Sequence, residues 1–152
     1  MYTLDEFMTA VDQSDGIVCY GIGKRFHMFL REFQETPIIE KLRFCIDAYA
    51  ENQHIKTENR LLEVQGLSSL QTVRDHHYVL IITNLRYDQV VDDLTDKGLR
   101  QGIQVFCFTH LYGMLLEKKA MNKWMPDNLR ITNEQRIPKI IHYCWFGGKT
   151  IP

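Results

Sequence analysis

The chain has 152 residues and a formal net charge of −1, with 45% hydrophobic and 24% charged residues. This length fits one domain, and the composition is typical of a globular protein. A nearly neutral chain gives no electrostatic reason to expect nucleic acid or an anionic membrane as a partner. No apolar run approaches the roughly 18 residues that span a bilayer, so we expect no transmembrane segment.

The cysteines indicate the redox environment of the protein. The N-terminal residues have neither the basic nor the apolar region of a secretory signal. Cysteines 19, 45, 107 and 144 lie singly within strand-like apolar runs. Such cysteines are typical of buried thiols in a reducing compartment, so we expect a cytoplasmic protein.

The first half of the chain alternates between helical and strand-like patterns. Residues 3–11 combine a capping box with apolar residues at helical spacing. Residues 17–20 are a compact strand-like run, and residues 24–33 return to the helical spacing until Pro37 stops the helix. Residues 42–47 predict the next strand.

The pattern continues in the centre of the chain. Residues 48–57 read as a loop, residues 61–64 as a short strand and residues 68–73 as a short helix. The strongest predicted strand covers residues 78–83, and its unbroken apolar run is typical of a central parallel strand. Residues 87–94 carry another helical stripe.

The last predicted elements are a strand at residues 103–108 and a helix at residues 110–119. Alternation of strands and helices predicts βαβ units with right-handed crossovers. We therefore predict an α/β fold of the Rossmann-like, doubly wound type: a mostly parallel sheet of about five strands with helices on both faces. Residues 1–120 form this domain, and the polar residues 121–136 are expected to be a linker.

A glycine-rich turn follows the first strand, where a dinucleotide-binding fingerprint would lie. Gly21 permits a tight turn, and Gly23 lets backbone N–H groups approach a phosphate at the helix N-terminus, beside Lys24. The third small residue of the fingerprint is replaced by Phe26. Its ring belongs to the apolar stripe of the helix, so we expect it to fill the gap between helix and sheet, to push the helix outward and to disturb the phosphate site. Asp47 ends the second strand, where a carboxylate binds a ribose hydroxyl. A nucleotide pocket is one interpretation; the incomplete fingerprint favours the other, a required turn with a solvated carboxylate.

Thr83 and Asn84 follow the central strand at its carboxyl end, where open α/β sheets bind ligands. These side chains are candidates to contact a nucleotide. They are equally well explained as the cap of the helix that begins near residue 86.

We assign no catalytic residue and no metal ligand. The adjacent histidines at 76 and 77 lack partners at metal-ligand spacing, and the four aspartates of residues 88–96 are typical of a solvated helix face. The sequence has no Asp-X-Asp, the carboxylate pair that holds a divalent ion against a leaving diphosphate. The chain alone is therefore expected not to transfer a sugar.

Residues 137–148, IPKIIHYCWFGG, predict a strand followed by a glycine turn. They resemble the start of the catalytic domain of bacterial capsular and lipopolysaccharide glycosyltransferases, the sugar transferases with an Asp-X-Asp motif. The resemblance implies that residues 137–152 open such a domain, so that the chain is the N-terminal part of a longer enzyme. It also implies a divalent metal and a nucleotide-sugar for that enzyme, but no cofactor for the present chain.

Residues 14–115 resemble a Rossmann-like accessory domain found with bacterial polysaccharide-assembly enzymes, such as sugar acyltransferases. This resemblance rests on the glycine turn, the second strand ending at Asp47, and the link from Gly98 to the last strand. It implies a non-catalytic domain in surface polysaccharide biosynthesis with other assembly proteins as partners. The unpaired strand in residues 139–148 also suggests strand addition, either to another chain, which would give a homo-oligomer, or to the edge of the chain's own sheet.

Two alternatives stay open. One is an NAD- or sugar-nucleotide-binding domain of an oxidoreductase or sensor, which fails if the Phe26 ring fills the space above the two glycines. The other is a pure protein-interaction module.

Overall fold

The computed structural model describes residues 2–58 and 60–124, and within them six strands form one sheet. The strands are β1 (Ile17–Tyr20), β2 (Leu42–Ile46), β3 (His54–Lys56), β4 (Leu61–Gln65), β5 (Val79–Ile82) and β6 (Gln104–Cys107). The helices are α1 (Leu4–Gln13), α2 (Lys24–Phe33), α3 (Pro37–Glu40), η1 (Leu67–Ser69), α4 (Leu70–Asp75), α5 (Tyr87–Asp96) and α6 (Phe108–Trp124).

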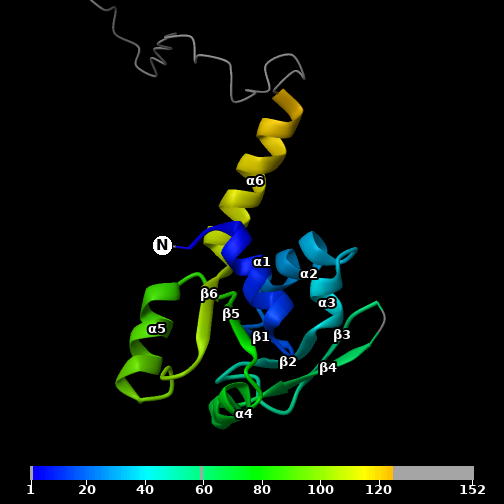
Figure 1. The fold of residues 1–152 in the computed structure, drawn as a ribbon. Coiled ribbons are helices and arrows are strands. Elements are labelled where there is room, and N and C mark those ends of the chain that lie inside the picture. The colour runs from blue at the N-terminus through cyan, green and yellow to red at the C-terminus, as the bar shows by residue number, and fades with distance from the viewer. Residues whose placement is uncertain (1, 59, 125–152) are drawn as a thin grey trace, which may run out of the picture.

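The sheet has the strand order β3-β4-β2-β1-β5-β6, and every neighbouring pair except β3 and β4 is parallel. The chain starts in the middle of the sheet and winds outward in both directions, which confirms the predicted doubly wound, Rossmann-like fold (Figure 1). The sheet has six strands instead of about five because β3 lies in a segment that we expected to be a loop. Its short, largely exposed sequence lacks the apolar alternation that predicts a strand.

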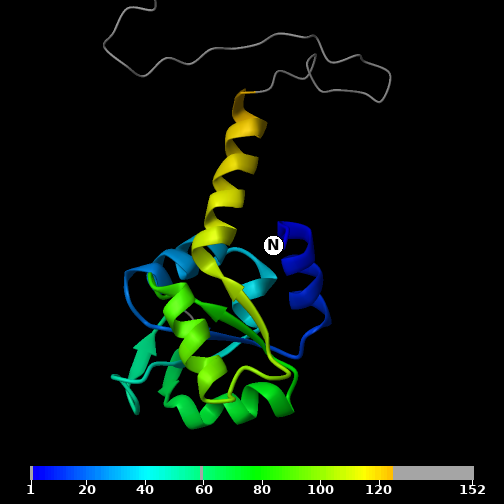
Figure 2. The same ribbon diagram turned by 90° about the vertical axis from the view of Figure 1, so that its left-hand side faces the viewer.

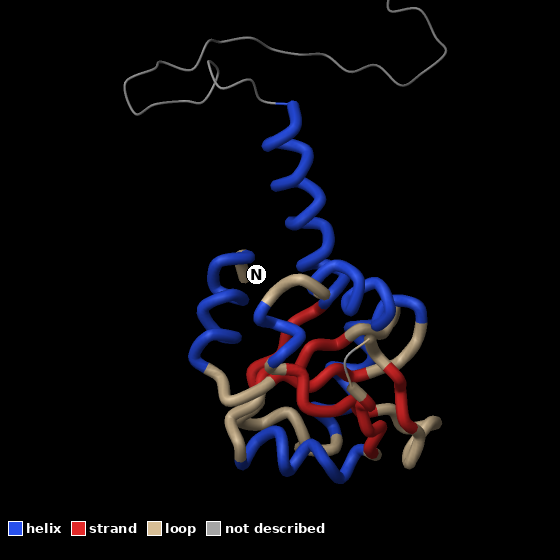
Figure 3. Tube along the Cα trace, turned by 90° about the vertical axis from the view of Figure 1, so that its right-hand side faces the viewer, coloured by secondary structure: helices blue, strands red, loops and turns tan. Residues whose placement is uncertain are grey.

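Helices cover both faces of the sheet, as Figures 2 and 3 show from opposite sides. Helices α1, α2, α3 and α6 bury their apolar residues in one core, and helices α4 and α5 bury theirs in the other. The central strand β1 serves both cores, because Ile17 and Cys19 point to the first and Val18 to the second. This two-sided burial explains why the central strands are almost entirely apolar.

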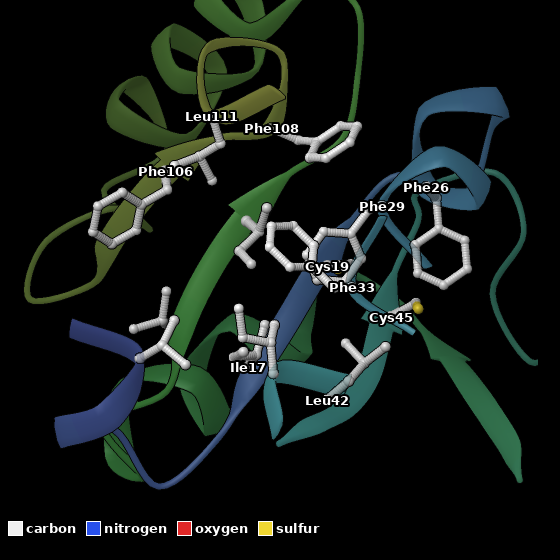
Figure 4. Packing of buried hydrophobic residues seen from close by; sticks show 14 of the residues in the cluster. Ile17, Cys19, Phe26, Phe29, Phe33, Leu42, Cys45, Phe106, Phe108 and Leu111 are labelled. Carbon is white, nitrogen blue, oxygen red and sulfur yellow. The ribbon is translucent and has the colours of Figure 1, made fainter. Parts of the chain in front are cut away.

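Aromatic rings dominate the first core (Figure 4). Phe29 of α2 meets Phe108 of α6 edge to face, with ring centroids 5.7 Å apart, and Phe7 of α1 meets Phe106 of β6 at 5.1 Å. These contacts join helices from distant parts of the sequence to the same face of the sheet. Pro37, predicted to stop the preceding helix, opens the short α3, a position that suits a residue without an N–H.

Helix α1 is capped at both ends. The predicted capping box between Thr3 and Glu6 is present at its N-terminus. At its C-terminus the ammonium group of Lys41 lies 2.7 Å from the carbonyl oxygen of Val11 and 3.0 Å from that of Ser14. The cation both satisfies terminal carbonyl groups and complements the helix dipole.

Helix α6 stands out from the body of the domain (Figures 1 and 2). Its first turns are anchored by the buried residues Phe108 and Leu111, and Lys119 pairs with Glu32 of α2. The helix runs to Trp124, four residues into the segment predicted to be a linker. Residues 116–123 are exposed, and an exposed helix needs no apolar stripe, so the sequence pattern did not predict its full length. Residues 137–152, predicted to open a catalytic domain with a strand and a glycine turn, lie outside the described residues.

Candidate functional site

The turn after β1 adopts the backbone conformation that its glycines permit. Gly21 has a φ of +95°, which disfavours any residue with a Cβ atom, and its N–H donates to the carbonyl oxygen of Ile46 at 2.8 Å. The turn thereby passes over the end of β2 and delivers Gly23 as the N-cap of α2. An ideal Cβ atom at Gly23 would meet no described atom within 4 Å, so the start of this helix faces open space.

Thr83 fastens the turn to β5. Its side chain is buried, and its hydroxyl oxygen lies 2.6 Å from the carbonyl oxygen of Gly21 and 2.9 Å from that of Tyr20. Both carbonyl oxygens thus have a donor nearby at the end of the central strands. Thr83 was predicted to contact a ligand. The structure adds a second role that the sequence did not reveal, which is to hold the glycine turn against the end of β5.

Asp47 braces the same turn from the other side. One carboxylate oxygen accepts a hydrogen bond from the N–H of Tyr49 at 2.9 Å, and the other accepts from the N–H of Ile22 at 3.4 Å. A carboxylate has about four acceptor positions, so these two bonds leave acceptor capacity for a hydroxyl group. The structural and the ligand-binding interpretations of Asp47 are thus compatible.

Asn84 begins the chain between β5 and α5. Its side-chain oxygen accepts a hydrogen bond from the N–H of Arg86 at 3.0 Å, which forms a local turn just before α5. The predicted cap is not formed, because the N-cap of α5 is Arg86 and no described side chain bonds to the backbone N–H groups of the first turn of the helix. The side chain of Asn84 also borders the space above Gly21.

The six candidate residues surround a single cleft of about 700 Å³. It lies at the carboxyl ends of the neighbouring parallel strands β1 and β5, which lead into helices on opposite faces of the sheet. This is the topological switch point, at which open α/β sheets bind ligands. The predicted members of its lining are Gly21, Gly23, Lys24, Asp47, Thr83 and Asn84. The sequence reasoning missed Ile22, Arg25, Met28, Leu85 and Tyr112. Ile22 and Arg25 are neighbours of predicted residues, but no local signal brings Tyr112 of α6 to this place.

The cleft is positively polarised at the start of α2. The first turn of this helix carries Lys24 and Arg25 and has no acidic residue, and the helix dipole adds further positive potential. The guanidinium group of Arg25 donates to the hydroxyl of Thr109 at the start of α6, which holds the arginine at the wall of the cleft. Backbone N–H groups, a helix dipole and two cations at one place favour an anionic group.

Phe26 does not close this cleft. Its side chain is fully buried in the core that joins α2 to the sheet, as Figure 4 shows, and it is absent from the described residues that line the cleft. The ring therefore occupies the space under the helix instead of the space above the glycines. The condition that would have ruled out the nucleotide-binding alternative is not met.

A second cavity of about 330 Å³ adjoins the first at Gly21, Asp47 and Asn84, on the face of the sheet that α5 covers. Tyr20 and the almost fully exposed Tyr49 both line it. Burial raises the pKa of Tyr20, with a smaller contribution from the nearby carboxylate of Asp47. The other lining residues are Ala48, Leu67, Arg86, Gln89, Val90, Asp93, Leu94 and Lys97.

The described part of the chain contains no group of three histidine, cysteine, aspartate or glutamate side chains arranged to hold a metal ion. Cys19 and Cys45 are buried beside each other on neighbouring strands, and burial raises the pKa of both thiols, that of Cys45 to about 12. Neither is an available nucleophile at neutral pH.

None of the helices in residues 2–124 that the structure describes has the length and apolar character needed to cross a membrane. Comparison of the chain with protein-family models, with curated proteins and with solved structures finds no match.

Proposed function

We propose that this chain is a non-catalytic, nucleotide-sugar-binding domain of a glycosyltransferase that builds a surface polysaccharide. One observation supports ligand binding above all others. Six residues chosen from the sequence, from three separate segments, line one cleft at the switch point of the sheet.

The arrangement suits a ligand with a diphosphate at its centre. The diphosphate would lie at the N-terminus of α2, near Gly23 and Lys24, because its charge complements the helix dipole and the lysine. Two cavities meet beside this point, so the groups at either end of the diphosphate would each have a separate space. Asp47 stands between the two cavities and would accept hydrogen bonds from sugar hydroxyl groups.

The glycosyltransferase part of the proposal depends on residues 137–148, whose sequence resembles the first strand and turn of a sugar-transferase domain. A metal-dependent transferase needs a carboxylate pair, and the sequence has no Asp-X-Asp. Sugar transfer, the divalent metal and the donor for the reaction are therefore assigned to a catalytic domain, and binding or regulation to this one.

A second candidate function is an NAD-binding domain of an oxidoreductase or sensor. Asp47 at the end of β2 favours it, since a carboxylate there binds the ribose of NAD in Rossmann domains. The replacement of the third small residue of the dinucleotide-binding fingerprint by Phe26 argues against it. A pure interaction module is the third candidate.

Thermal unfolding with a ligand panel separates the three. We expect UDP- or dTDP-sugars at millimolar concentration to raise the Tm by several degrees, because a ligand at 100 times its Kd adds about 2.7 kcal/mol to the free energy of unfolding. Lys24→Ala should weaken this effect, whereas His27→Ala, on the same helix but outside the cleft lining, is the matched control. A rise with NAD or NADH alone would favour the oxidoreductase, and no rise with any ligand would favour the interaction module.

A further inference from the structure

A third cavity, of about 280 Å³, lies between α2, α3 and the hairpin of β3 and β4, elements that Figure 1 labels. We call it the basic pocket, because Arg31, Lys56 and Arg60 line it. It shares no described lining residue with the cleft at the glycine turn. Its volume is close to the lower limit of cavities that bind small organic molecules, which is about 300 Å³.

Arg60 is held in place at the wall of the basic pocket. The hydroxyl group of Thr57 donates to the carbonyl oxygen of Arg60 at 2.8 Å and accepts from its N–H at 3.3 Å, which closes the turn of the hairpin. The guanidinium group of Arg60 donates to the carbonyl oxygen of Ile39 in α3. Arginine has further N–H donors, so Arg60 is positioned by the protein and can still bind a ligand.

The positive charges at the basic pocket lack counterions. Among the described residues, the side chains of Arg31 and Lys56 have no hydrogen-bond or ion-pair partner. Burial lowers the pKa of Arg60, and the charge of the nearby Arg43 acts in the same direction. The charged guanidinium group of Arg60 is therefore held at a cost in free energy, which a bound anion would offset.

The charge of the basic pocket suits a dianion. Its described lining has three cations and the carboxylate of Glu58, which leaves a net charge of +2 when His27 is neutral. A phosphate monoester carries about −1.5 to −2 charges at pH 7, more than a carboxylate does. Two guanidinium groups also favour phosphate, because each can bind its oxygens bidentately. The C-terminal end of α2 borders the pocket at Gln34, but its dipole contributes only about half a negative charge.

One wall of the basic pocket is apolar. Leu30 of α2 and Ile39 of α3 line it, and both side chains also pack against the first core. A phosphate ion alone would leave this wall in contact with water. Cations beside an apolar wall therefore favour a ligand that joins an apolar body to a charged group.

We propose that the basic pocket is a second binding site, which takes a small phosphate monoester with an apolar body. The phosphate would lie between Arg31 and Arg60, beside Lys56, and the apolar body would contact Leu30 and Ile39. Because the described linings of the two sites have no residue in common, the proposal does not depend on the binding of a nucleotide-sugar in the cleft.

Titration of the 152-residue chain with phenyl phosphate tests the proposal. We expect the largest amide NMR shifts at Leu30, Arg31 and Lys56. Calorimetry in a phosphate-free buffer should give a Kd at least about tenfold lower than for inorganic phosphate, phenol or benzoate, which lack the apolar body, the charge and the second charge, respectively. An equal Kd for phenyl phosphate and any of these three would overturn the proposal. Shifts confined to Gly21 and Gly23 would also overturn it, because the phosphate would then bind in the cleft.

Two pairs of variants test the cations. Arg31→Gln removes an exposed guanidinium group that lines the pocket and should lower the affinity for phenyl phosphate about tenfold. Its control is Arg100→Gln, which removes an exposed guanidinium group elsewhere and should leave the affinity unchanged. Lys56→Gln and its control Lys118→Gln form the second pair. The proposal is overturned if either pocket variant loses no more affinity than its control, since the net charge of the chain would then explain the binding.

Discussion

The hydroxyl oxygen of Thr83 lies 2.6 Å from the carbonyl oxygen of Gly21, and this contact joins the end of β5 to the turn that follows β1. Both groups are buried, so removal of the hydroxyl leaves an acceptor without its partner. We expect Thr83→Val to lower the free energy of unfolding by about 1–3 kcal/mol. Thr83→Ser keeps the hydroxyl and should recover most of the loss in urea denaturation. Equal losses in the two variants would contradict this role of the hydroxyl.

The two glycines of the turn should separate stability from ligand binding. Gly21→Ala forces a Cβ atom onto a backbone with a φ of +95° and should cost about 1–2 kcal/mol of folding free energy. Gly23→Ala meets open space at a φ of −76°, and its poorer capping is offset by the lower entropy of the unfolded chain. We expect its stability to stay near that of the wild type.

Gly23→Ala should nevertheless lower the affinity for the nucleotide-sugar at least tenfold, because the added methyl group would separate a phosphate from the N–H groups of α2. Titration calorimetry measures this affinity, and urea denaturation of the same samples measures the stability. Unchanged affinity in a folded Gly23→Ala protein would place the phosphate elsewhere.

Lys41 should contribute to stability although it is far from the cleft. Its ammonium group contacts the carbonyl oxygens of Val11, Asp12 and Ser14 at the end of α1. We expect Lys41→Met to lower the free energy of unfolding by about 1–2 kcal/mol. Lys118→Met, on the exposed part of α6, removes the same charge and should have little effect. A loss of similar size in both variants would show that net charge, and not the helix end, is responsible.

The phenol of Tyr2 should make stability depend on alkaline pH. Burial raises the pKa of Tyr2 from its ordinary value of 10 to about 12, although its hydrogen bond with Cys107 acts in the opposite direction. Between these values the unfolded chain loses the proton that the folded chain keeps. The contribution of this group is therefore complete below pH 10 and is lost as the pH rises toward 12.

Tyr2→Phe removes both this titration and the two hydrogen bonds to Cys107. We expect it to be less stable than the wild type at pH 8, and the difference to shrink between pH 10 and pH 12. Tyr49→Phe, whose ring in the wild type is 99% exposed, controls for the loss of a surface phenol. A difference that stays constant over this range would contradict the role of Tyr2 at the sheet edge.

The sequence predicts the architecture well because strand-like and helix-like apolar patterns alternate along the chain and a glycine turn follows the first strand. Both features are typical of a doubly wound sheet. The apolar run at residues 78–83 identifies the central strand β5, and the end of β2 at Ile46 places Asp47 beside the glycine turn. Since the carboxyl ends of parallel strands share one edge, residues after three strands could be expected around one cleft.

Other features depend on contacts that no local pattern records. The strand β3 is held by pairing with β4, and its side chains carry no apolar alternation. Tyr112 reaches the cleft only because α6 packs against α2. Packing between distant elements decides both features. The burial of the Phe26 ring between α2 and the sheet, by contrast, is what its place in the apolar stripe of the helix predicted.

The bond between Tyr2 and Cys107 also has a consequence for biosynthesis. At 5–20 residues per second, a ribosome delivers Cys107 roughly 5–20 seconds after Tyr2. During that interval helix α1 cannot make its contacts with β6, so its apolar face stays unpacked on that side. A chaperone that binds this helix would have the same interval in which to act.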